Sequence, residues 1–307
     1  MSTAFLFPGQ GSHKIGMGRD LYDHAPEARD LFEQADDLLG FKLSTLCFEG
    51  PEDTLTNTVN QQPALFVTSM AAYKVAILAG WESPAFAAGH SLGELSALAA
   101  VGSLSFADGL TLVRRRGELM AAAGEKAPGA MAALLALDVA TVEAVCKEAS
   151  AEVGQPVQIA NDNCPGQIVI SGNETALVRA MELAKERKAR KVIRIGITIA
   201  AHSQLMASAA AEFAEVVDAT EIHSPSIPVI GNVTAQPLTT PEEIRAELKA
   251  QLTSAVAWTA SINYLLAQGV DTFVELGSGQ VLLSLVKRIS RKTKRIKFKV
   301  GEASTGG

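Results

Sequence analysis

A serine between two glycines is the residue of this chain whose surroundings most clearly suggest chemistry. Ser91 lies in the sequence GHSLG at residues 89–93, between a short apolar run and a stretch with helical character. In such a G-x-S-x-G pattern the glycines permit a sharp strand-to-helix turn that presents the serine oxygen at the carboxyl edge of a sheet. A plain turn in which Ser91 caps the following helix has the same pattern. The motif alone leaves a nucleophile and a helix cap open.

A serine nucleophile needs a general base, and the chain has five histidines. Histidine is the usual partner because its unperturbed pKa lies near neutrality. His202 follows a strand-like segment and precedes a helical one, so we expect it at the same sheet edge as the serine. His13 and His223 are weaker candidates, His90 adjoins the serine and His24 lies in a polar stretch. His202 is the predicted base.

Two backbone segments are candidates for stabilising a negatively charged oxygen during the reaction. Leu92 opens the helix that follows the serine, where backbone N–H groups have no partner within the helix. The loop PGQGS at residues 8–12 follows the first apolar run and should open at the same sheet edge. Its glycines allow close approach of the backbone, although a simple glycine turn has the same composition.

Alternating strand and helix signals fill the two outer parts of the chain and predict a parallel sheet covered by helices. Strands are expected at residues 3–7, 85–88, 228–234 and 271–276, and helices at 25–39, 63–79, 92–100, 203–217, 241–252, 262–268 and from 279.

The middle of the chain has a different order of elements. Strands at 131–137, 156–161, 167–172 and 191–197, with helices at 140–153 and from Asn173, give the ferredoxin-like β-α-β-β-α-β pattern. Residues 128–198 are therefore predicted to form a small subdomain inserted into a large, discontinuous α/β subdomain of residues 1–127 and 199–307.

The composition is that of a globular protein with a sizeable core, because 48% of the 307 residues are hydrophobic and 20% are charged. The apolar run at residues 3–7 is too short for a signal peptide, and no run approaches the roughly 20 residues of a membrane span. We expect a cytoplasmic protein without membrane contact. Cys47, Cys146 and Cys164 have no metal-ligand spacing, which predicts reduced thiols and no metal site.

The basic residues are unevenly distributed. The segment of residues 287–299, which begins with Lys287 and ends with Lys299, holds eight of the 27 lysines and arginines and no acidic residue. Because the net charge of the whole chain is −6, the remainder carries −14. This segment is either a docking surface for an acidic partner or a solvated helix end. No nucleic-acid motif accompanies it.

Several motifs follow one another along nearly the whole chain: FPGQGS at 7–12, QQPALF at 61–66, GHSLGELSAL at 89–98, RRG at 115–117, NCPGQIVISG at 163–172, GNVTA at 231–235 and ELGSGQVL at 275–282. With these motifs in this order, the chain resembles the malonyl-CoA:acyl carrier protein transacylases. The resemblance covers nearly the whole chain. It implies an α/β-hydrolase-like large subdomain with a ferredoxin-like insertion, which agrees with the order of elements above.

The resemblance also implies roles for individual residues. Ser91 would carry the malonyl group and His202 would be its base. The backbone N–H groups of Gln10 and Leu92 would form the oxyanion hole. A backbone carbonyl at Gln251, in place of an aspartate, would orient the histidine.

Two further residues are assigned to substrate binding by the same resemblance. Arg116 matches the arginine that pairs with the free carboxylate of malonate. On a helix from residue 105 to 123, Arg115 points to solvent while Arg114 and Arg116 flank the apolar face, so the pattern alone also allows a surface salt bridge. Asn163 is expected to line the cleft from the small subdomain, with a turn-forming asparagine as the alternative.

The implied activity is ping-pong transfer of malonyl from malonyl-CoA to the phosphopantetheine thiol of acyl carrier protein, for fatty acid synthesis. No cofactor or metal is implied, since CoA and the carrier arm are substrates. We expect a monomer, and residues 287–299 are the candidate docking surface for its carrier, with a solvated helix end as the alternative. Three alternatives stay open: a free-standing polyketide-synthase acyltransferase, a serine hydrolase or thioesterase with the same turn, and a non-catalytic carrier-binding module.

Overall fold

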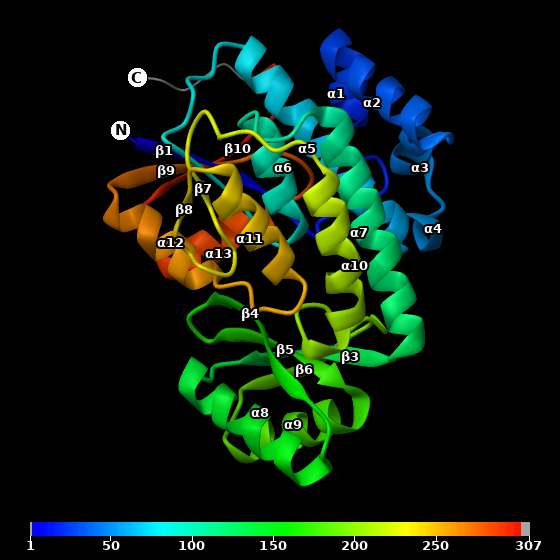
Figure 1. The fold of residues 1–307 in the computed structure, drawn as a ribbon. Helices are drawn as coiled ribbons and strands as arrows, with labels where there is room; N and C mark the ends of the chain where they lie inside the picture. The colour runs from blue at the N-terminus through cyan, green and yellow to red at the C-terminus, as the bar shows by residue number, and fades with distance from the viewer. Residues whose placement is uncertain (1, 302–307) are drawn as a thin grey trace.

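The computed structural model describes residues 2–301, and within them the chain forms two sheets (Figure 1). Met1 and residues 302–307, at the outer ends of the predicted large subdomain, lie outside the described residues. The larger sheet has the strand order β10-β9-β1-β2-β7-β8, and the smaller has the order β4-β5-β3-β6. The strands are β1 (Ser2–Phe7), β2 (Phe86–Gly89), β3 (Gly129–Leu135), β4 (Val157–Cys164), β5 (Gln167–Asn173), β6 (Lys191–Ile195), β7 (Val229–Ile230), β8 (Pro237–Leu238), β9 (Val270–Glu275) and β10 (Lys294–Lys297).

Helices connect these strands and cover both sheets. Within the described residues, no helix combines the length and the apolar character needed to cross a bilayer. The helices are α1 (Arg19–His24), α2 (Pro26–Leu39), α3 (Leu43–Glu49), α4 (Glu52–Thr56), α5 (Thr58–Leu78), α6 (Leu92–Ala100), α7 (Phe106–Lys126), α8 (Val139–Val153), α9 (Glu174–Glu186), α10 (Ala207–Ala219), α11 (Pro241–Gln251), α12 (Trp258–Ala267) and α13 (Val281–Ile289), with a 3₁₀ turn at Gln204–Met206.

The larger sheet is parallel from β10 to β7, and β8 alone pairs antiparallel within it. Successive side chains of a strand point to opposite faces, and β1 shows the result. Phe5 and Phe7 pack into the core shared with α2, α5, α6, α7 and α10, whereas Ala4 and Leu6 pack toward α12 and α13. Both faces of the sheet are therefore covered, and the loops that follow β1 and β2 meet at its carboxyl edge.

The smaller sheet is built by residues 129–195 in the order β3-α8-β4-β5-α9-β6, and all of its pairs are antiparallel. Helices α8 and α9 cover one face, where Ala132 and Leu134 are buried. Met131 and Val169 on the other face join the core of the larger unit, above the smaller sheet in Figure 1. The predicted α/β fold with a ferredoxin-like insertion is confirmed, while the limits 128–198 stay a prediction.

Helix α5 begins five residues before the predicted start at Pro63. The side chain of Asn57 accepts a hydrogen bond from the N–H of Val59 and so caps the helix. The prediction places proline at the first helical position, but here it lies inside the helix after its first turn. The asparagine cap is the stronger signal for the helix start.

The basic segment of residues 287–299 contains a strand that the sequence pattern does not predict. After α13 ends, β10 pairs in parallel with β9 at the edge of the larger sheet. Charged residues are typical of edge strands, because they discourage pairing with another chain. Lys297 donates to the carbonyl of Gly277, and burial lowers the pKa of Lys297 to about 8.

Candidate active site

The GHSLG turn connects β2 directly to α6 and places Ser91 in a strained conformation. Its φ is 53° and its ψ is −109°, in the region that side chains normally avoid. The flanking glycines are required by contact: a Cβ on Gly89 would lie 1.9 Å from the carbonyl carbon of Gly93, and one on Gly93 would lie 2.0 Å from the Phe7 oxygen. Ser91 makes no side-chain cap to α6. The helix-cap interpretation of the motif is therefore wrong.

The Ser91 hydroxyl is instead hydrogen-bonded to His202. The distance from Ser91 Oγ to His202 Nε2 is 2.8 Å, and the two residues are 8% and 3% exposed. His202 Nδ1 lies 2.9 Å from the carbonyl oxygen of Gln251 and 3.1 Å from that of Ser254. Carbonyls only accept hydrogen bonds, so Nδ1 carries the proton and Nε2 is left free to accept the serine proton.

The surroundings of His202 favour its neutral form. Burial, together with the nearby positive charge of Arg116, lowers the pKa of His202 to about 3, while the two carbonyls oppose the shift. A neutral imidazole is what a general base requires. Gln158 donates from its amide to the carbonyl of His202 and to that of Thr253, which fixes the backbone around the ring.

The two segments that hold the predicted oxyanion donors, Gln10 and Leu92, both adjoin the serine turn. Leu92 is the first residue of α6, so its N–H has no partner earlier in that helix. The loop of residues 8–12 packs on the serine turn, because a Cβ on Gly9 would lie 2.2 Å from the His90 carbonyl oxygen. The side chain of Gln10 donates at 2.7 Å to both Thr58 and Gln61, which holds the loop in place.

Arg116 reaches the serine from α7 and is completely buried. Its Nη2 donates to Ser91 Oγ at 3.1 Å and to Gln251 Oε1 at 2.8 Å, and its Nη1 donates to Gln62 Oε1 at 2.9 Å. Its Nε has no hydrogen-bond partner among residues 2–301. The surface ion pairs that the helical pattern allowed are made by Arg114 and Arg115 with Glu118.

No carboxylate is hydrogen-bonded to the Arg116 guanidinium in the described residues. Burial lowers the pKa of Arg116 to about 10, so the side chain is still charged at neutral pH. A buried cation surrounded by neutral acceptors is well suited to receive a carboxylate from a ligand.

Asn163 lies on β4 and joins the smaller sheet to the serine turn. Its Oδ1 accepts a hydrogen bond of 2.8 Å from Nε2 of His90. Burial lowers the pKa of His90, in accord with a neutral ring that donates from Nε2. Asn163 is thus close to the site, but its side chain contacts the residue before the serine.

Sequence reasoning missed three polar residues that support the site. Gln62 is fully buried and binds Arg116. Asn232 accepts the N–H of Ser91 at 2.7 Å and donates to the carbonyl of Gly89 at 2.7 Å, so one amide binds the first residue and the central serine of the turn. Glu94, 0% exposed, binds the amides of Asn232 and Gln251. All three lie in the motifs described above. A polar residue within an otherwise apolar run was the sequence feature that could have identified them.

Comparison with known proteins agrees with this geometry. The model of the acyl transferase domain family matches residues 4–300. A malonyl CoA-acyl carrier protein transacylase of Bacillus subtilis (strain 168) is 48% identical over 293 residues, covering 95% of this chain and 92% of that relative. This chain belongs to the malonyl CoA-acyl carrier protein transacylase family.

Solved structures of family members superpose closely on this one. An acyl-carrier-protein-S-malonyltransferase from Bartonella henselae is 42% identical, with a TM-score of 0.94 over 99% of this chain and 97% of that chain. A malonyl-transacylase in complex with a type II PKS acyl-carrier protein is 37% identical, with a TM-score of 0.94 over 97% and 96% of the two chains. The predicted family membership is confirmed, and the protein is an acyltransferase.

The other candidate groups of this acyltransferase have partners other than Ser91 or are buried cysteines. His13 is hydrogen-bonded to Thr56 and Gln61, and His223 pairs with Glu221 on the surface. The three cysteines are free and buried.

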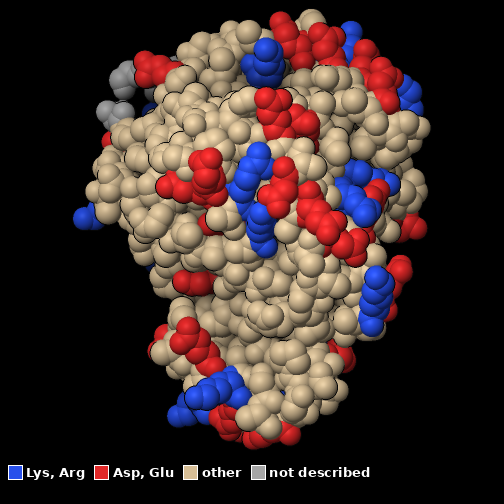
Figure 2. All heavy atoms as spheres, in the orientation of Figure 1, with Lys and Arg blue, Asp and Glu red and all other residues tan. Residues whose placement is uncertain are grey.

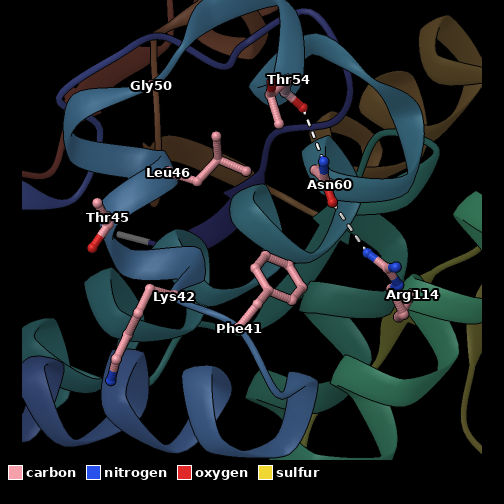
Figure 3. Close-up of a pocket in the computed structure, with 8 residues that line it drawn as sticks. All are labelled: Phe41, Lys42, Thr45, Leu46, Gly50, Thr54, Asn60 and Arg114. Atoms are coloured by element: carbon pink, nitrogen blue, oxygen red, sulfur yellow. Dashed lines mark hydrogen bonds between the residues drawn. The ribbon is translucent and has the colours of Figure 1, made fainter.

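A surface hollow of about 390 Å³ also lies outside the site (Figure 3). In it, Asn60 bridges between Thr54 and Arg114, and Arg114 is further bound by Glu118. Neither Ser91 nor His202 lines this hollow, so it is separate from the acyl site.

Proposed function

We propose that this protein transfers the malonyl group of malonyl-CoA to the phosphopantetheine thiol of acyl carrier protein, through a malonyl ester on Ser91. The observation that carries the proposal is the position of one hydroxyl between two groups. Ser91 Oγ lies 2.8 Å from the unprotonated nitrogen of His202 and 3.1 Å from the buried cation of Arg116. The first group activates the nucleophile, and the second recognises an acyl group that ends in a carboxylate.

In the first half-reaction, Ser91 Oγ attacks the thioester carbon while its proton moves to His202 Nε2. The resulting imidazolium is stabilised by the carbonyls that accept from Nδ1. The N–H groups of Gln10 and Leu92 would bind the oxyanion. The carbon–sulfur bond then breaks, and Nε2 returns the proton to the departing CoA thiolate.

In the second half-reaction the steps run in reverse with a new thiol. The phosphopantetheine thiol gives its proton to His202 Nε2 and its sulfur attacks the ester carbon. The bond from that carbon to Ser91 Oγ breaks, and Nε2 returns the proton to the serine. CoA and the carrier arm enter as substrates, and we propose that no cofactor or metal takes part.

Selectivity for malonyl over acetyl is assigned to Arg116. The carboxylate of malonate supplies the partner that the guanidinium lacks, whereas an acetyl group leaves the cation without one. Asn163 is proposed to border the substrate from the smaller sheet, where it is held by His90.

The proposed partner is acyl carrier protein, as in the relative whose structure is a complex with such a carrier. On the face drawn in Figure 2, lysine and arginine lie among aspartate and glutamate, so this face has no broad basic field. Most basic side chains of residues 287–299 are exposed, and we propose that this segment attracts the acidic carrier. We further propose a cytoplasmic monomer that supplies fatty acid synthesis.

Two rival activities would use the same serine. A hydrolase would pass the acyl group to water, and a buried arginine beside the nucleophile disfavours the neutral acyl groups that most such enzymes accept. A polyketide-pathway transacylase has the same chemistry and differs in its carrier. The carrier that accepts malonyl fastest distinguishes the two pathways.

Intact-mass measurement after exposure to malonyl-CoA tests the proposal. We expect one malonyl adduct on the wild type, none on Ser91→Ala, and an adduct on Ser96→Ala. Ser96 is the matched control because it lies buried on α6, the helix that follows Ser91, and its hydroxyl has no hydrogen-bond partner in the described part of the chain.

Three outcomes would contradict the proposal. An adduct that survives in Ser91→Ala would remove the serine from its role. Steady release of free CoA without a carrier, and without a lasting adduct, would indicate a hydrolase. No adduct on the wild type would indicate a non-catalytic carrier-binding module.

A further inference from the structure

A fully buried carboxylate lies next to the serine turn and has no role in the transfer mechanism proposed above. Glu94 is on the first turn of α6 and is 0% exposed. Its Oε1 accepts the backbone N–H of Asn232 at 2.8 Å and the side-chain amide of Asn232 at 3.0 Å. Its Oε2 accepts from Nε2 of Gln251. A buried carboxylate is costly unless it is well bonded, so this arrangement calls for a function.

Glu94 is the acceptor in all three of these hydrogen bonds. Two belong to Asn232 and one to Gln251, and a carboxylate matches three donors better than a carboxylic acid, whose own proton would face one of them. Burial, followed by the neighbouring Glu247, raises the pKa of Glu94 well above its usual range, although the hydrogen bonds from Asn232 and Gln251 and the charge of Arg116 act in the opposite direction. The negative charge of Glu94 in turn raises the pKa of Arg116 and so partly offsets the lowering by burial.

The Gln251 amide lies between this carboxylate and Arg116. Its NH₂ end donates to Glu94 and to the carbonyl of Ser91, and its oxygen end accepts from Arg116 Nη2 at 2.8 Å. An amide can turn end for end, and the reversed orientation would place NH₂ against the guanidinium. The acceptors on the far side therefore decide which end Arg116 meets.

We propose that Glu94 is a positioning residue for malonyl recognition: its carboxylate fixes the direction of the Gln251 amide and so holds Arg116 ready for the substrate carboxylate. The inference rests on the proposed transfer through Ser91. It assigns to Glu94 no contact with substrate, only an effect through Gln251.

Replacing Glu94 by glutamine should disturb its contact with Gln251 and keep its contacts with Asn232. The new side chain has one oxygen and one NH₂ group, and its oxygen is needed by Asn232, whose backbone N–H cannot turn. The introduced NH₂ group then faces the NH₂ of Gln251, which must either move away or turn its own NH₂ toward Arg116. Both movements disturb Arg116, while the hold of Asn232 on the serine turn is kept.

The test compares second-order rates of Ser91 acylation by malonyl-CoA and by acetyl-CoA, followed by intact mass. In Glu94→Gln we expect the malonyl rate to fall about 10- to 100-fold, the range for loss of one charge-assisted hydrogen bond. The acetyl rate should change by less than about threefold, because an acetyl group does not use the arginine. Both rates scale with the same folded fraction, so their ratio is insensitive to partial unfolding.

Glu247→Gln is the matched control. Glu247 is a buried carboxylate close to Glu94, but it accepts from Val233 and Thr234 and makes no hydrogen bond to Gln251 or Arg116. Its malonyl-to-acetyl ratio should stay at the wild-type value. If Glu94→Gln yields no folded protein, Glu94→Asp replaces it: the charge is kept, but the shorter side chain cannot bind both amides, and the ratio should again fall.

An unchanged ratio in the folded Glu94 variant overturns the inference, and so does an equal fall of the ratio in Glu247→Gln. These results leave the proposed function intact as long as malonyl-CoA labels the wild type at Ser91. Absence of that label overturns the proposed function itself, so the two failures are distinguishable.

Discussion

Acidification should lower the free energy of unfolding of this protein through His202, and the size of the effect can be worked out from the pKa of this residue. Burial holds the pKa of His202 at about 3 in the folded protein, against an ordinary value of 6.5 in the unfolded chain. Below pH 6.5 the unfolded chain binds a proton that the folded protein does not. The stability that this histidine contributes is therefore complete above pH 6.5 and is lost as the pH falls toward 3.

The size of the effect follows from the two pKa values. Between pH 7 and pH 5 the unfolded imidazole becomes almost fully protonated while the folded one stays neutral. This difference lowers the free energy of unfolding by about 2 kcal/mol, at 1.36 kcal/mol for each pH unit below 6.5. Burial also shifts the pKa values of His90, Glu94 and Glu247, so the effect of His202 has to be isolated by comparison with a variant.

Urea unfolding of the wild type and of His202→Gln at pH 7 and pH 5 makes that comparison. The wild type should lose about 2 kcal/mol more than the variant between the two pH values. His223→Gln is the control, because that side chain is 60% exposed and meets water in both states, and it should lose as much as the wild type. Parallel losses in the wild type and His202→Gln, within about 0.5 kcal/mol, would refute the argument that burial keeps this imidazole neutral.

Two further predictions follow from contacts at the site. Arg116→Ala should lower the malonyl acylation rate about 100-fold or more, since the charged hydrogen bonds to the substrate carboxylate are lost, and should spare acetyl transfer; equal losses for both substrates in rate measurements would contradict this. Gly93→Ala should destabilise the fold by about 3 kcal/mol or more, because its Cβ would lie 2.0 Å from the Phe7 oxygen. Gly196→Ala, where a Cβ would meet nothing within 4 Å, should leave the unfolding midpoint near that of the wild type.

The sequence predicted those features whose signal is local. The order of strand and helix patterns predicted both sheets, because the strands β1 to β7 and β9 each have an apolar run with a turn beside it. The two-residue strand β8 (Pro237–Leu238) was not predicted. The serine turn was found from five letters, since only glycine at residues 89 and 93 avoids the short contacts that the turn imposes. His202 followed because the ends of parallel strands meet at one edge.

Features that depend on contacts across the fold were missed. The helical pattern placed Arg114 and Arg116 alike, on the two flanks of one apolar face, and only tertiary contacts with α5 and α11 distinguish the buried second from the partly exposed first. Asn232 and Glu94 are 138 residues apart, and no pattern in the sequence around either residue predicts that they are hydrogen-bonded. Strand β10 escaped prediction because basic residues dominate it, while its pairing with β9 decides its structure.

The Arg116 guanidinium donates to the side-chain amides of Gln62 and Gln251 and to no carboxylate in the described residues, and this choice of partners has a physical reason. A carboxylate in direct contact would neutralise the guanidinium and would compete with malonate for it. The structure places the balancing charge one residue further away, on Glu94, with the Gln251 amide between them. At that distance the charge of Glu94 still acts on the buried cation, while Nε of Arg116 keeps no hydrogen-bond partner among residues 2–301. In the proposed function, selectivity for an acidic acyl group therefore depends on a cation that is charged, buried and incompletely paired, and the carboxylate of malonate would complete its hydrogen bonds.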